Sequence, residues 1–567
     1  MKKTKKLLSM LLATVALGST FAGCGGMSNS TGDSTIIYVM NTGGGVGRVW
    51  LDNAIERFTA AKEGHSYEDG KTGVTFEIEH SLDTGVETMS SSGYNIYFTG
   101  SPAVLALQQA GNLICIDDIV KEKSDTRNGV AISIEDKIPE QYRTAFQGAD
   151  GKYYGLPHFA LYPGITYNVD LFEAEDMYIA APGQSADKAE VEESDFGTVS
   201  FALKGADGIY GTDDDGKKSC GNDGIYGTYD DGLPTSLIEF LVLCDRMDGN
   251  GIEPLSFRPG YEKYLIKALW ASLAGPESFQ TQYTYTGTLE HVVSLSETEK
   301  LFAGIDYIKK PNTQTTTIDR GMGYLANDNV ARYYAMAMAE ILETEGWYSN
   351  YTYVGTLTHI DYMTNFVYSG KQGKTKQGMF LEGDYWYNEA RDNEVFLEYE
   401  TLTKDTNRRM AWMPLPTDAY ESVTEGNGRQ YTMVNDSECF AFINANISEN
   451  AGLVQACKDF LKFCYSDAEL SEFTACTGVY RSAMEYPMDN ITANMPYFTK
   501  SVATCRSATT TVAINGYKDE LYNSSVLEVT LDKKYGSYWK AMRVGKTTEE
   551  IWEATRTKAS GWGVVNH

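Results

Sequence analysis

The sequence predicts a mixed α/β protein with at least two lobes. Apolar runs of β type alternate with helical patterns along the chain, an order that is typical of α/β proteins. Removal of the N-terminal leader described below leaves 544 of the 567 residues. This is more than one domain of ~100–200 residues usually holds. Hydrophobic residues make up 42% of the chain, which is enough for ordinary globular cores.

The first elements follow from apolar periodicity. We expect a strand over residues 35–40, a glycine-rich loop over 41–47 and a helix over 48–61 that places Leu51, Ile55 and Phe58 on one face. Two further strands and four helices are expected, at 73–80 and 95–100 and at 103–111, 329–346, 449–466 and 545–560.

The N-terminus predicts export and lipidation. A basic tip is followed by an apolar run over 7–22 and then by Phe21-Ala22-Gly23-Cys24, which is similar to a bacterial lipobox although leucine usually stands where Phe21 does. We expect a signal peptide over 1–23, a lipid on Cys24 and a flexible tether over 24–34. The apolar run is short of the ~20 residues of a membrane-spanning helix, the alternative interpretation.

The chain is strongly acidic. The formal net charge is −29, and loss of the four leader lysines brings it to −33. This charge argues against nucleic acid or an anionic membrane surface as a partner, and favours an acidic surface that binds hard cations. Tyrosines outnumber phenylalanines by 39 to 22, which suits a polar, ring-shaped ligand.

The acidic, glycine-rich composition of residues 173–234 indicates an insertion or a long surface loop. Within it, the ten residues 207–216 return as 223–232 with nine identities. Carboxylates at the first, eighth and ninth positions, with glycines between, suit the oxygen ligands that Ca²⁺ prefers, although the spacing is not that of an EF-hand. The alternative is a solvated pair of acidic turns. The candidate ligands of a structural Ca²⁺ are Asp207, Asp213, Asp215, Asp223, Asp230 and Asp231.

Motifs of several enzyme classes are missing from the sequence. The loop Gly43–Gly47 fits no phosphate or dinucleotide fingerprint, and it favours close approach of backbone to a ligand. The six histidines form no close metal-binding pair, and no GxSxG elbow occurs. A pair of carboxylates for glycoside hydrolysis stays possible, because the chain has 77 acidic residues.

Aromatic side chains gather near two loops. Tyr385-Trp386-Tyr387 follows Glu382-Gly383-Asp384, and Tyr153, Tyr154, His158 and Tyr162 lie in or beside GLPHFALYPGITYN. Sugar rings stack on aromatic faces while carboxylates and amides bind their hydroxyl groups. The alternative is that these rings belong to the core.

These segments resemble, in their order along the chain, the extracellular solute-binding proteins of bacterial ABC sugar importers (family 1, similar to maltose-binding protein). The similarity rests on YNIYFTGSPAVLALQQAGNLICIDD, YGLPHFALYPGITYNVDLF, GMFLEGDYWYNE, AWMPLPT and NAGLVQACKDFLKFCYSDAELSEFTACTGVYRS. The resemblance implies a two-lobed periplasmic-binding-protein-like (type II) fold with a ligand cleft between the lobes. The N-terminal lobe would comprise 35–162 and 414–484, the C-terminal lobe 163–413 and 485–567, and the chain would cross near 160–167, 412–416 and 481–487.

The resemblance also implies a set of ligand-binding residues, among which we expect the aromatic residues after Gly383 to contribute most. Asn95 and Leu161 depart from the maltose-binding pattern, and 280–323 looks like an addition to the second lobe, so the sugar cannot be read from the sequence. The implied residues are Asn41, Thr42, His80, Asp83, Thr99, Ser101, His158, Tyr162, Tyr264, Trp270, Tyr385 and Trp386.

The resemblance implies a lipid-anchored, monomeric receptor on the outer face of the cell membrane. It would capture a carbohydrate, in particular an oligosaccharide, and deliver it to a membrane permease pair driven by a cytoplasmic ATPase, without catalysis. The alternatives are an extracellular glycosidase and a receptor for a peptide or another polar solute. Eight cysteines follow Cys24, and the sequence favours buried thiols over disulfides without deciding the pairing.

Overall fold

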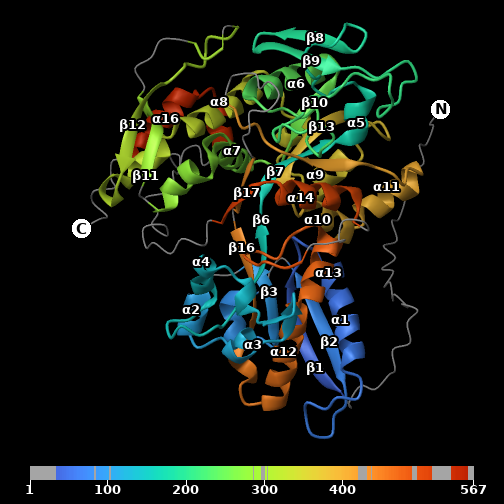
Figure 1. Ribbon diagram of the computed structural model, residues 1–567, viewed down its shortest axis with the longest axis vertical. Helices are drawn as coiled ribbons and strands as arrows, with labels where there is room; N and C mark the ends of the chain where they lie inside the picture. Colours follow the sequence, from blue (N-terminus) through green and yellow to red (C-terminus); the bar gives the residue numbers. More distant parts are fainter. Residues whose placement is uncertain are drawn as a thin grey trace, which may run out of the picture.

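The computed structural model of the chain shows two lobes, one above the other in Figure 1. The N-terminal strands and helices lie in the lower lobe, and the middle of the chain forms the upper lobe. The structure describes residues 34–81, 85–100, 104–284, 287–294, 300–302, 304–418, 431–435, 437–487, 495–513 and 538–559.

The N-terminal lobe is built on a five-stranded sheet. Its strand order is β2-β1-β3-β16-β6, with β1 parallel to β2 and β3, and with β16 antiparallel to β3 and β6. The strands are β1 (Thr35–Thr42), β2 (Val74–Ser81), β3 (Ile96–Gly100), β6 (Leu156–Leu161) and β16 (Ser437–Ile443). The helices are α1 (Val49–Ala61), α2 (Val104–Gln109), α3 (Asp117–Lys121), α4 (Glu140–Arg143), α12 (Ala451–Cys464) and α13 (Asp467–Thr477). A short hairpin is formed by β4 (Asp125–Arg127) and β5 (Val130–Ile132).

The C-terminal lobe is built on a four-stranded sheet of order β10-β13-β7-β14. The strands are β7 (Pro163–Asn168), β10 (Ile252–Ser256), β13 (Lys376–Gly383) and β14 (Met410–Met413). The helices are α5 (Val169–Ala174), α6 (Leu237–Gly249), α7 (Glu262–Thr284), α8 (Val330–Thr344), α9 (His359–Val367), α10 (Trp386–Asp392), α11 (Val395–Thr403), α14 (Tyr497–Ser507), α15 (Tyr538–Arg543) and α16 (Thr548–Ala559). Further pairs are the hairpins β8 (Ala189–Ser194) with β9 (Gly197–Ala202) and β11 (Gly287–Ser294) with β12 (Asn312–Ile318), and the parallel pair β15 (Thr432–Asn435) with β17 (Thr510–Ala513).

Each lobe has its own hydrophobic core. One cluster of buried side chains runs from Ile37 to Phe159 and resumes from Cys439 to Met484. The other contains residues between Ala160 and Val434 and resumes at Phe498. Because the cores are separate, the chain segments that pass between them are the natural positions for hinge motion.

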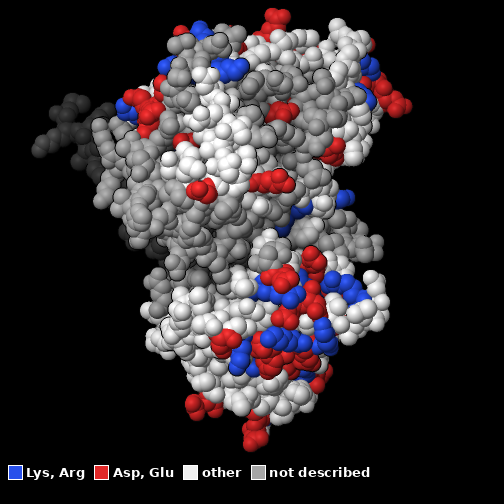
Figure 2. All heavy atoms as spheres, turned by 60° about the vertical axis from the view of Figure 1, so that its left-hand side comes forward, with Lys and Arg blue, Asp and Glu red and all other residues white. Residues whose placement is uncertain are grey.

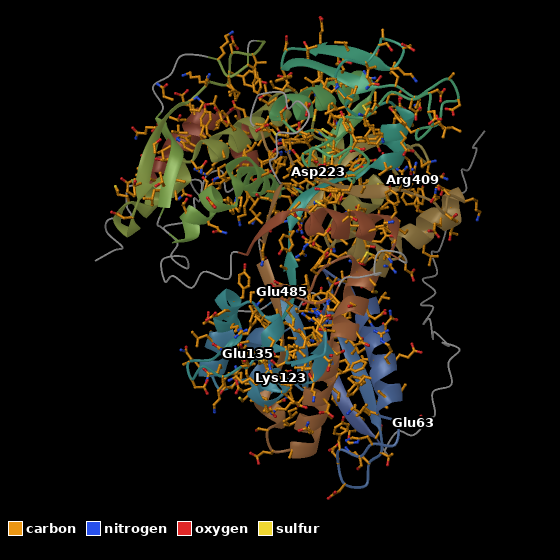
Figure 3. The ribbon with its side chains drawn as sticks, in the orientation of Figure 1. Glu63, Lys123, Glu135, Asp223, Arg409 and Glu485 are labelled. Atoms are coloured by element: carbon orange, nitrogen blue, oxygen red, sulfur yellow. The ribbon has the colours of Figure 1, made fainter. Side chains whose placement is uncertain are left out.

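Three passages between the lobes can be located from the described residues. The first passage is at Tyr162, between β6 and β7. The second lies between β15 and β16, whereas the sequence analysis placed it at 412–416. Residues 414–418 and 431–435 therefore belong to the C-terminal lobe, because Leu415 is buried in its core and Thr417 N donates to Thr235 O at 3.0 Å. Near the third passage, Glu485 N donates a hydrogen bond to Lys137 O at 2.8 Å. Figure 3 shows Glu485 where the two lobes meet.

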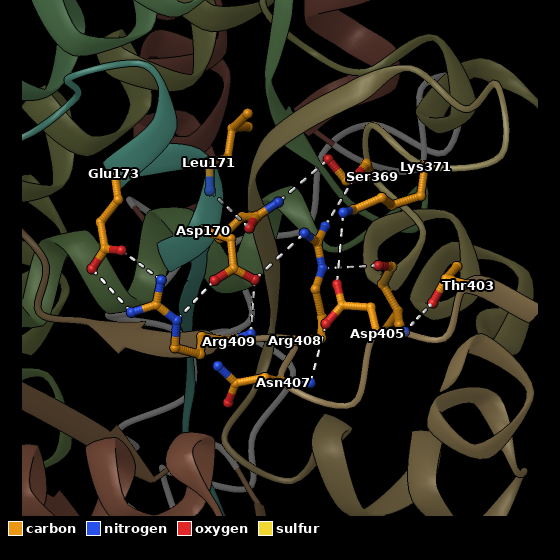
Figure 4. Close-up of polar contacts among 12 residues, drawn as sticks. Asp170, Leu171, Glu173, Ser369, Lys371, Thr403, Asp405, Asn407, Arg408 and Arg409 are labelled. Atoms are coloured by element: carbon orange, nitrogen blue, oxygen red, sulfur yellow. Dashed lines mark hydrogen bonds and ion pairs between the residues drawn. The ribbon is translucent and has the colours of Figure 1, made fainter. Parts of the chain in front are cut away.

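An ion-pair network ties distant segments of the C-terminal lobe together (Figure 4). Arg409, before β14, pairs with Asp170 at 2.8 Å and with Glu173 at 2.5 Å, both on α5. Arg408 donates to the backbone oxygens of Val367 and Ser369 at 3.1 and 2.9 Å. This network holds the edge of the sheet that carries β14.

The surface of the N-terminal lobe mixes both signs of charge. On the face shown in Figure 2, basic side chains of the lower lobe lie among acidic ones. Lys458 pairs with Asp118 at 2.8 Å, and Lys462 pairs with Glu122 at 2.6 Å. All eight cysteines of the described residues are free thiols. Within the described ranges, no helix combines the length and the apolar character that crossing a membrane requires.

Candidate functional site

Helix α10 of the C-terminal lobe contacts the loop between β1 and α1 of the N-terminal lobe. Glu389 Oε1 accepts a hydrogen bond from Gly45 N at 2.6 Å. Asp392 Oδ2 accepts one from Arg48 N at 2.8 Å. The partial positive charge at the N-terminus of the 13-residue helix α1 favours these carboxylates. The two lobes therefore meet through carboxylate-to-amide contacts at this edge, which we call the lobe junction.

The glycines of this loop are required by close approaches. Gly45 has a φ of +68°, and a Cβ there would lie 2.3 Å from the ring of Phe159. Gly47 has a φ of +72°, and its Cβ would lie 2.6 Å from Asp392 Oδ2. Only glycine combines this backbone conformation with these contacts. The loop does let the backbone approach other groups closely: Gly45 approaches Phe159 of the same lobe, and Gly47 approaches Asp392 of the opposite lobe.

His80 connects the sheet of the N-terminal lobe to the lobe junction. Asn41 Nδ2 donates to His80 Nδ1 at 2.9 Å and to Gly47 O at 3.2 Å. Since Nδ1 accepts, the ring proton lies on Nε2, which is 3.4 Å from Asp392 Oδ2. Thr42, also at the end of β1, donates from Oγ1 to Phe98 O at 3.2 Å. The ends of β1 and β2 thus supply polar groups to this region.

The C-terminal lobe contributes three tyrosines to this region. Tyr385 is partly exposed at the start of α10, and its hydroxyl donates to Glu382 Oε1 at 2.9 Å. Tyr261 and Tyr264 pack edge to face with ring centroids 5.0 Å apart. Burial, and after it the nearby carboxylate of Glu382, raises the pKa of the Tyr261 hydroxyl, so this ring also lies near Glu382. The arrangement offers partly exposed rings beside carboxylates.

Burial makes the carboxylates of this region weak acids. It raises the pKa of Glu382 to about 8, with a further rise from the nearby Glu389. It raises the pKa of Glu389 to about 7 and that of Asp384 to about 7. Asp384 Oδ1 accepts from Tyr162 N at 3.2 Å, while its Oδ2 has no hydrogen-bond partner in the part of the chain that the structure describes. These groups are poor places for a bare negative charge and good acceptors for ligand donors.

The stability of the folded protein should depend on pH through Glu389. Its pKa lies above the ordinary value, so the folded protein binds more protons than the unfolded chain between about pH 4.5 and 7. Protonated Glu389 contributes its full stabilisation of the folded state below about pH 4.5, and this contribution is lost as the pH rises through about 7. We expect Glu389→Gln, which keeps an acceptor for Gly45 N, to match the wild type near pH 5 and to exceed it by roughly 1–3 kcal/mol at pH 8.

Thermal melts from pH 5 to pH 8 test this expectation. Glu398→Gln, at an exposed position of α11, is the matched control and should follow the wild type. Parallel curves for wild type and Glu389→Gln across the whole range would contradict the role of burial at this carboxylate.

Several residues expected in the site belong to the core instead. Trp386 is 0% exposed, and its Nε1 donates to Thr166 Oγ1 at 2.8 Å. It faces the core because α10 turns its first residue inward beneath β13. Trp270 is 6% exposed on α7 and packs against Phe279 with ring centroids 5.2 Å apart. Neither indole offers a free face to a ligand.

The first passage likewise buries its polar side chains. His158 is 1% exposed and lies against the rings of Trp50 and Phe98, because β6 is covered by helices at this point. Tyr162 is 3% exposed, and Arg506 Nη2 contacts its hydroxyl at 3.4 Å.

The remaining expected residues fall into three groups. Thr99 and Asn41 are buried at strand ends, each about 1% exposed. Thr42, His80, Tyr264 and Tyr385 are partly exposed, and the structure brings His80 and Tyr385 to the two sides of the junction around α10. The predictions for Cys24, Asp83 and Ser101 lie outside the described residues.

Sequence reasoning missed the acidic residues of α10. Glu389 and Asp392 are three residues apart, so they lie on one face of the helix that follows Tyr385. That spacing in GDYWYNEARD was the available signal. It could not reveal a contact with a loop 344 residues away in sequence.

The two acidic repeats have matching hydrogen bonds. Asp207 Oδ1 accepts from Ile209 N at 2.8 Å, and the equivalent Asp223 Oδ1 accepts from Ile225 N at 2.7 Å. The ninth position, Asp215 or Asp231, accepts from the glycine amide four residues earlier at 2.6 or 2.7 Å. Oxygens of Asp207, Asp214 and Asp215 lie within 4.8 Å of one another, a set that contains Asp214 in place of the expected Asp213.

Comparisons with known proteins establish the fold. No family model and no curated protein matches the sequence. A solved structure described as a chitin oligosaccharide binding protein has a TM-score of 0.51 and 14% identity, covering 94% of this chain and 100% of its own. The bacterial solute receptor AcbH, described as having an exclusive substrate preference for β-D-galactopyranose, has a TM-score of 0.50 and 11% identity, with coverage of 94% and 100%. The chain thus has the two-lobed α/β fold of these solute-binding proteins, as the sequence resemblance implied.

Proposed function

We propose that this chain, which has the two-lobed fold of solute-binding proteins, captures a carbohydrate between its lobes and delivers it unchanged to an ABC importer. The observation that carries the proposal is the meeting, at the lobe junction, of partly exposed tyrosines and weakly acidic carboxylates from one lobe with His80 from the other. The names of the two structural neighbours, which bind a chitin oligosaccharide and a galactopyranose, support a sugar as the ligand class.

The chemistry of the junction suits a neutral, hydroxylated ligand. Sugar hydroxyl groups donate hydrogen bonds, which buried carboxylates such as Glu382 accept without needing a cationic partner. The apolar faces of a sugar ring stack on tyrosines such as Tyr385 and Tyr264. A receptor for charged peptides would instead need ionised anchors at the junction, and burial holds Glu382 and Glu389 toward their neutral forms at pH 7.

The contacts of α10 argue against the alternative of a glycosidase. That reaction needs two carboxyl groups free to face the glycosidic bond from opposite sides. Glu389 and Asp392 are instead engaged by the backbone amides of Gly45 and Arg48. They act as contacts between the lobes, so binding without catalysis is the function that this arrangement favours.

We place the protein on the outer face of the cell membrane, held by a lipid on Cys24 after removal of residues 1–23. The support is the leader sequence and its small-residue approach to Cys24. In this position a monomer would present its bound sugar to a permease pair driven by a cytoplasmic ATPase.

We also propose that the repeat loops bind structural Ca²⁺, supported by the grouping of Asp207, Asp214 and Asp215. Chelation is then expected to lower the free energy of unfolding by about 1–3 kcal/mol relative to protein in excess CaCl₂. The measurement is a thermal melt in EDTA and in CaCl₂. Asp214→Asn should reduce the difference, whereas Asp187→Asn, an exposed site in the same insertion, should preserve it. Identical melts in both buffers would contradict the proposal.

The test of function is calorimetry of the mature, lipid-free protein against malto-, xylo-, manno-, galacto- and chito-oligosaccharides. Mass spectrometry of the recovered sugar accompanies each titration. Saturable binding of intact sugar is the expected result. Shortened products would establish the glycosidase instead, and no binding across the panel would overturn the carbohydrate assignment.

A further inference from the structure

The C-terminal lobe contains a cavity away from the lobe junction. Its volume is about 700 Å³, which is within the range of small-molecule sites. The β8–β9 hairpin, residues 179–186 and 219–221, and the start of α6 surround it. Figure 1 shows β8, β9 and α6 at the top of the upper lobe, at the far end from the junction with the lower lobe.

One end of this cavity carries a buried carboxylate. Glu239 is the third residue of α6 and is only 6% exposed. Its Oε2 accepts three hydrogen bonds, from Thr235 N and Thr235 Oγ1 at 2.7 Å and from Ser236 N at 3.3 Å. Among the described residues, Oε1 accepts no hydrogen bond and no cationic side chain pairs with Glu239. Burial accordingly raises the pKa of this group.

The neighbouring polar groups differ from Glu239 in how they are satisfied. Glu190 also lines the cavity, and Arg246 pairs with it at 2.8 Å. Ser219 is a lining residue, but its Oγ is inaccessible to solvent and has no hydrogen-bond partner among the described residues. Glu239 Oε1 is therefore an acceptor at the cavity wall without a partner among the described residues, and such a group points to a missing ligand.

Much of the remaining wall is aliphatic, although Gln184, Thr198 and Ser200 also line it. Ile179, Val199 and Leu203 are representative, with several alanines beside them. Of the side chains described, no lysine, arginine or aromatic residue lines the cavity. The wall therefore lacks both the ring faces on which sugars stack and the cations that would bind an anion.

We propose that this cavity binds a small aliphatic amine, with its ammonium group on Glu239 Oε1 and its alkyl chain along the aliphatic wall. The ammonium group supplies the positive charge that Glu239 lacks. This site is independent of the proposed carbohydrate site.

The test is calorimetry of the mature protein with 1,5-diaminopentane, and with 1,5-pentanediol as a neutral probe of equal length. The diamine should bind saturably and the diol should not. Glu239→Gln should weaken diamine binding about tenfold or more, because it removes the charge. Glutamine at this helix position still supports the capping box with Ser236, so the variant should fold.

Two further variants keep the test decisive. Ala186→Phe places a ring at an exposed position of the cavity wall and should weaken diamine binding without touching α6. Glu193→Gln, an exposed residue of β8 that does not line the cavity, should leave binding unchanged. Absence of diamine binding, equal affinity in Glu239→Gln or Ala186→Phe, or equal binding of the diol would each overturn the proposal.

Discussion

Replacing Trp386 with alanine is expected to lower the free energy of unfolding by about 3–5 kcal/mol. The indole is fully buried, packs against Phe366, Phe380 and Phe498, and donates to Thr166 Oγ1 at 2.8 Å. Its removal leaves a cavity in the core of the C-terminal lobe and an unpaired hydroxyl group. Urea unfolding followed by circular dichroism measures the loss.

Leu397→Ala is the control for this substitution, since Leu397 is 60% exposed on the next helix and its truncation should cost little. The sequence analysis placed Trp386 in the binding site, where alanine would weaken sugar binding and leave stability intact. That second pattern of results would contradict the structure at α10.

The second large effect is expected at Tyr385, on carbohydrate binding. Tyr385→Ala should weaken the affinity for the cognate sugar by about 1–3 kcal/mol, because it removes both the ring and the hydroxyl that donates to Glu382. Tyr385→Phe keeps the ring and should lose less. Calorimetry of the three proteins under one set of conditions measures the difference.

Tyr497→Ala provides the matched control, because Tyr497 is 50% exposed on α14. It should bind sugar like the wild type. If Tyr385→Ala retained full affinity while remaining folded, the stacking surface would have to lie elsewhere.

The periodic parts of the fold were predictable from the sequence. The helix expected over 48–61 is α1 (Val49–Ala61), and the one expected over 449–466 is α12 (Ala451–Cys464). These segments have long apolar stripes that only a helix can bury on one side. The fold class followed from the alternation of such segments with strands, and the two-lobed arrangement from the family resemblance.

The predictions that were wrong concern features that depend on contacts between segments distant in sequence. Trp386 and Tyr385 are adjacent in sequence, and only the direction of α10 decides that one is core and the other partly exposed. The second passage was misplaced because residues 414–418 pair with Thr235, at the end of the insertion. The contact of Glu389 with Gly45 joins two lobes and leaves no local pattern.

Hydrogen–deuterium exchange with and without a saturating sugar shows directly whether a carbohydrate binds at the lobe junction. Protection is expected to concentrate in residues 43–48 of one lobe and 382–392 of the other. Protection confined to a single lobe, or centred on the cavity around Glu239, would contradict this expectation.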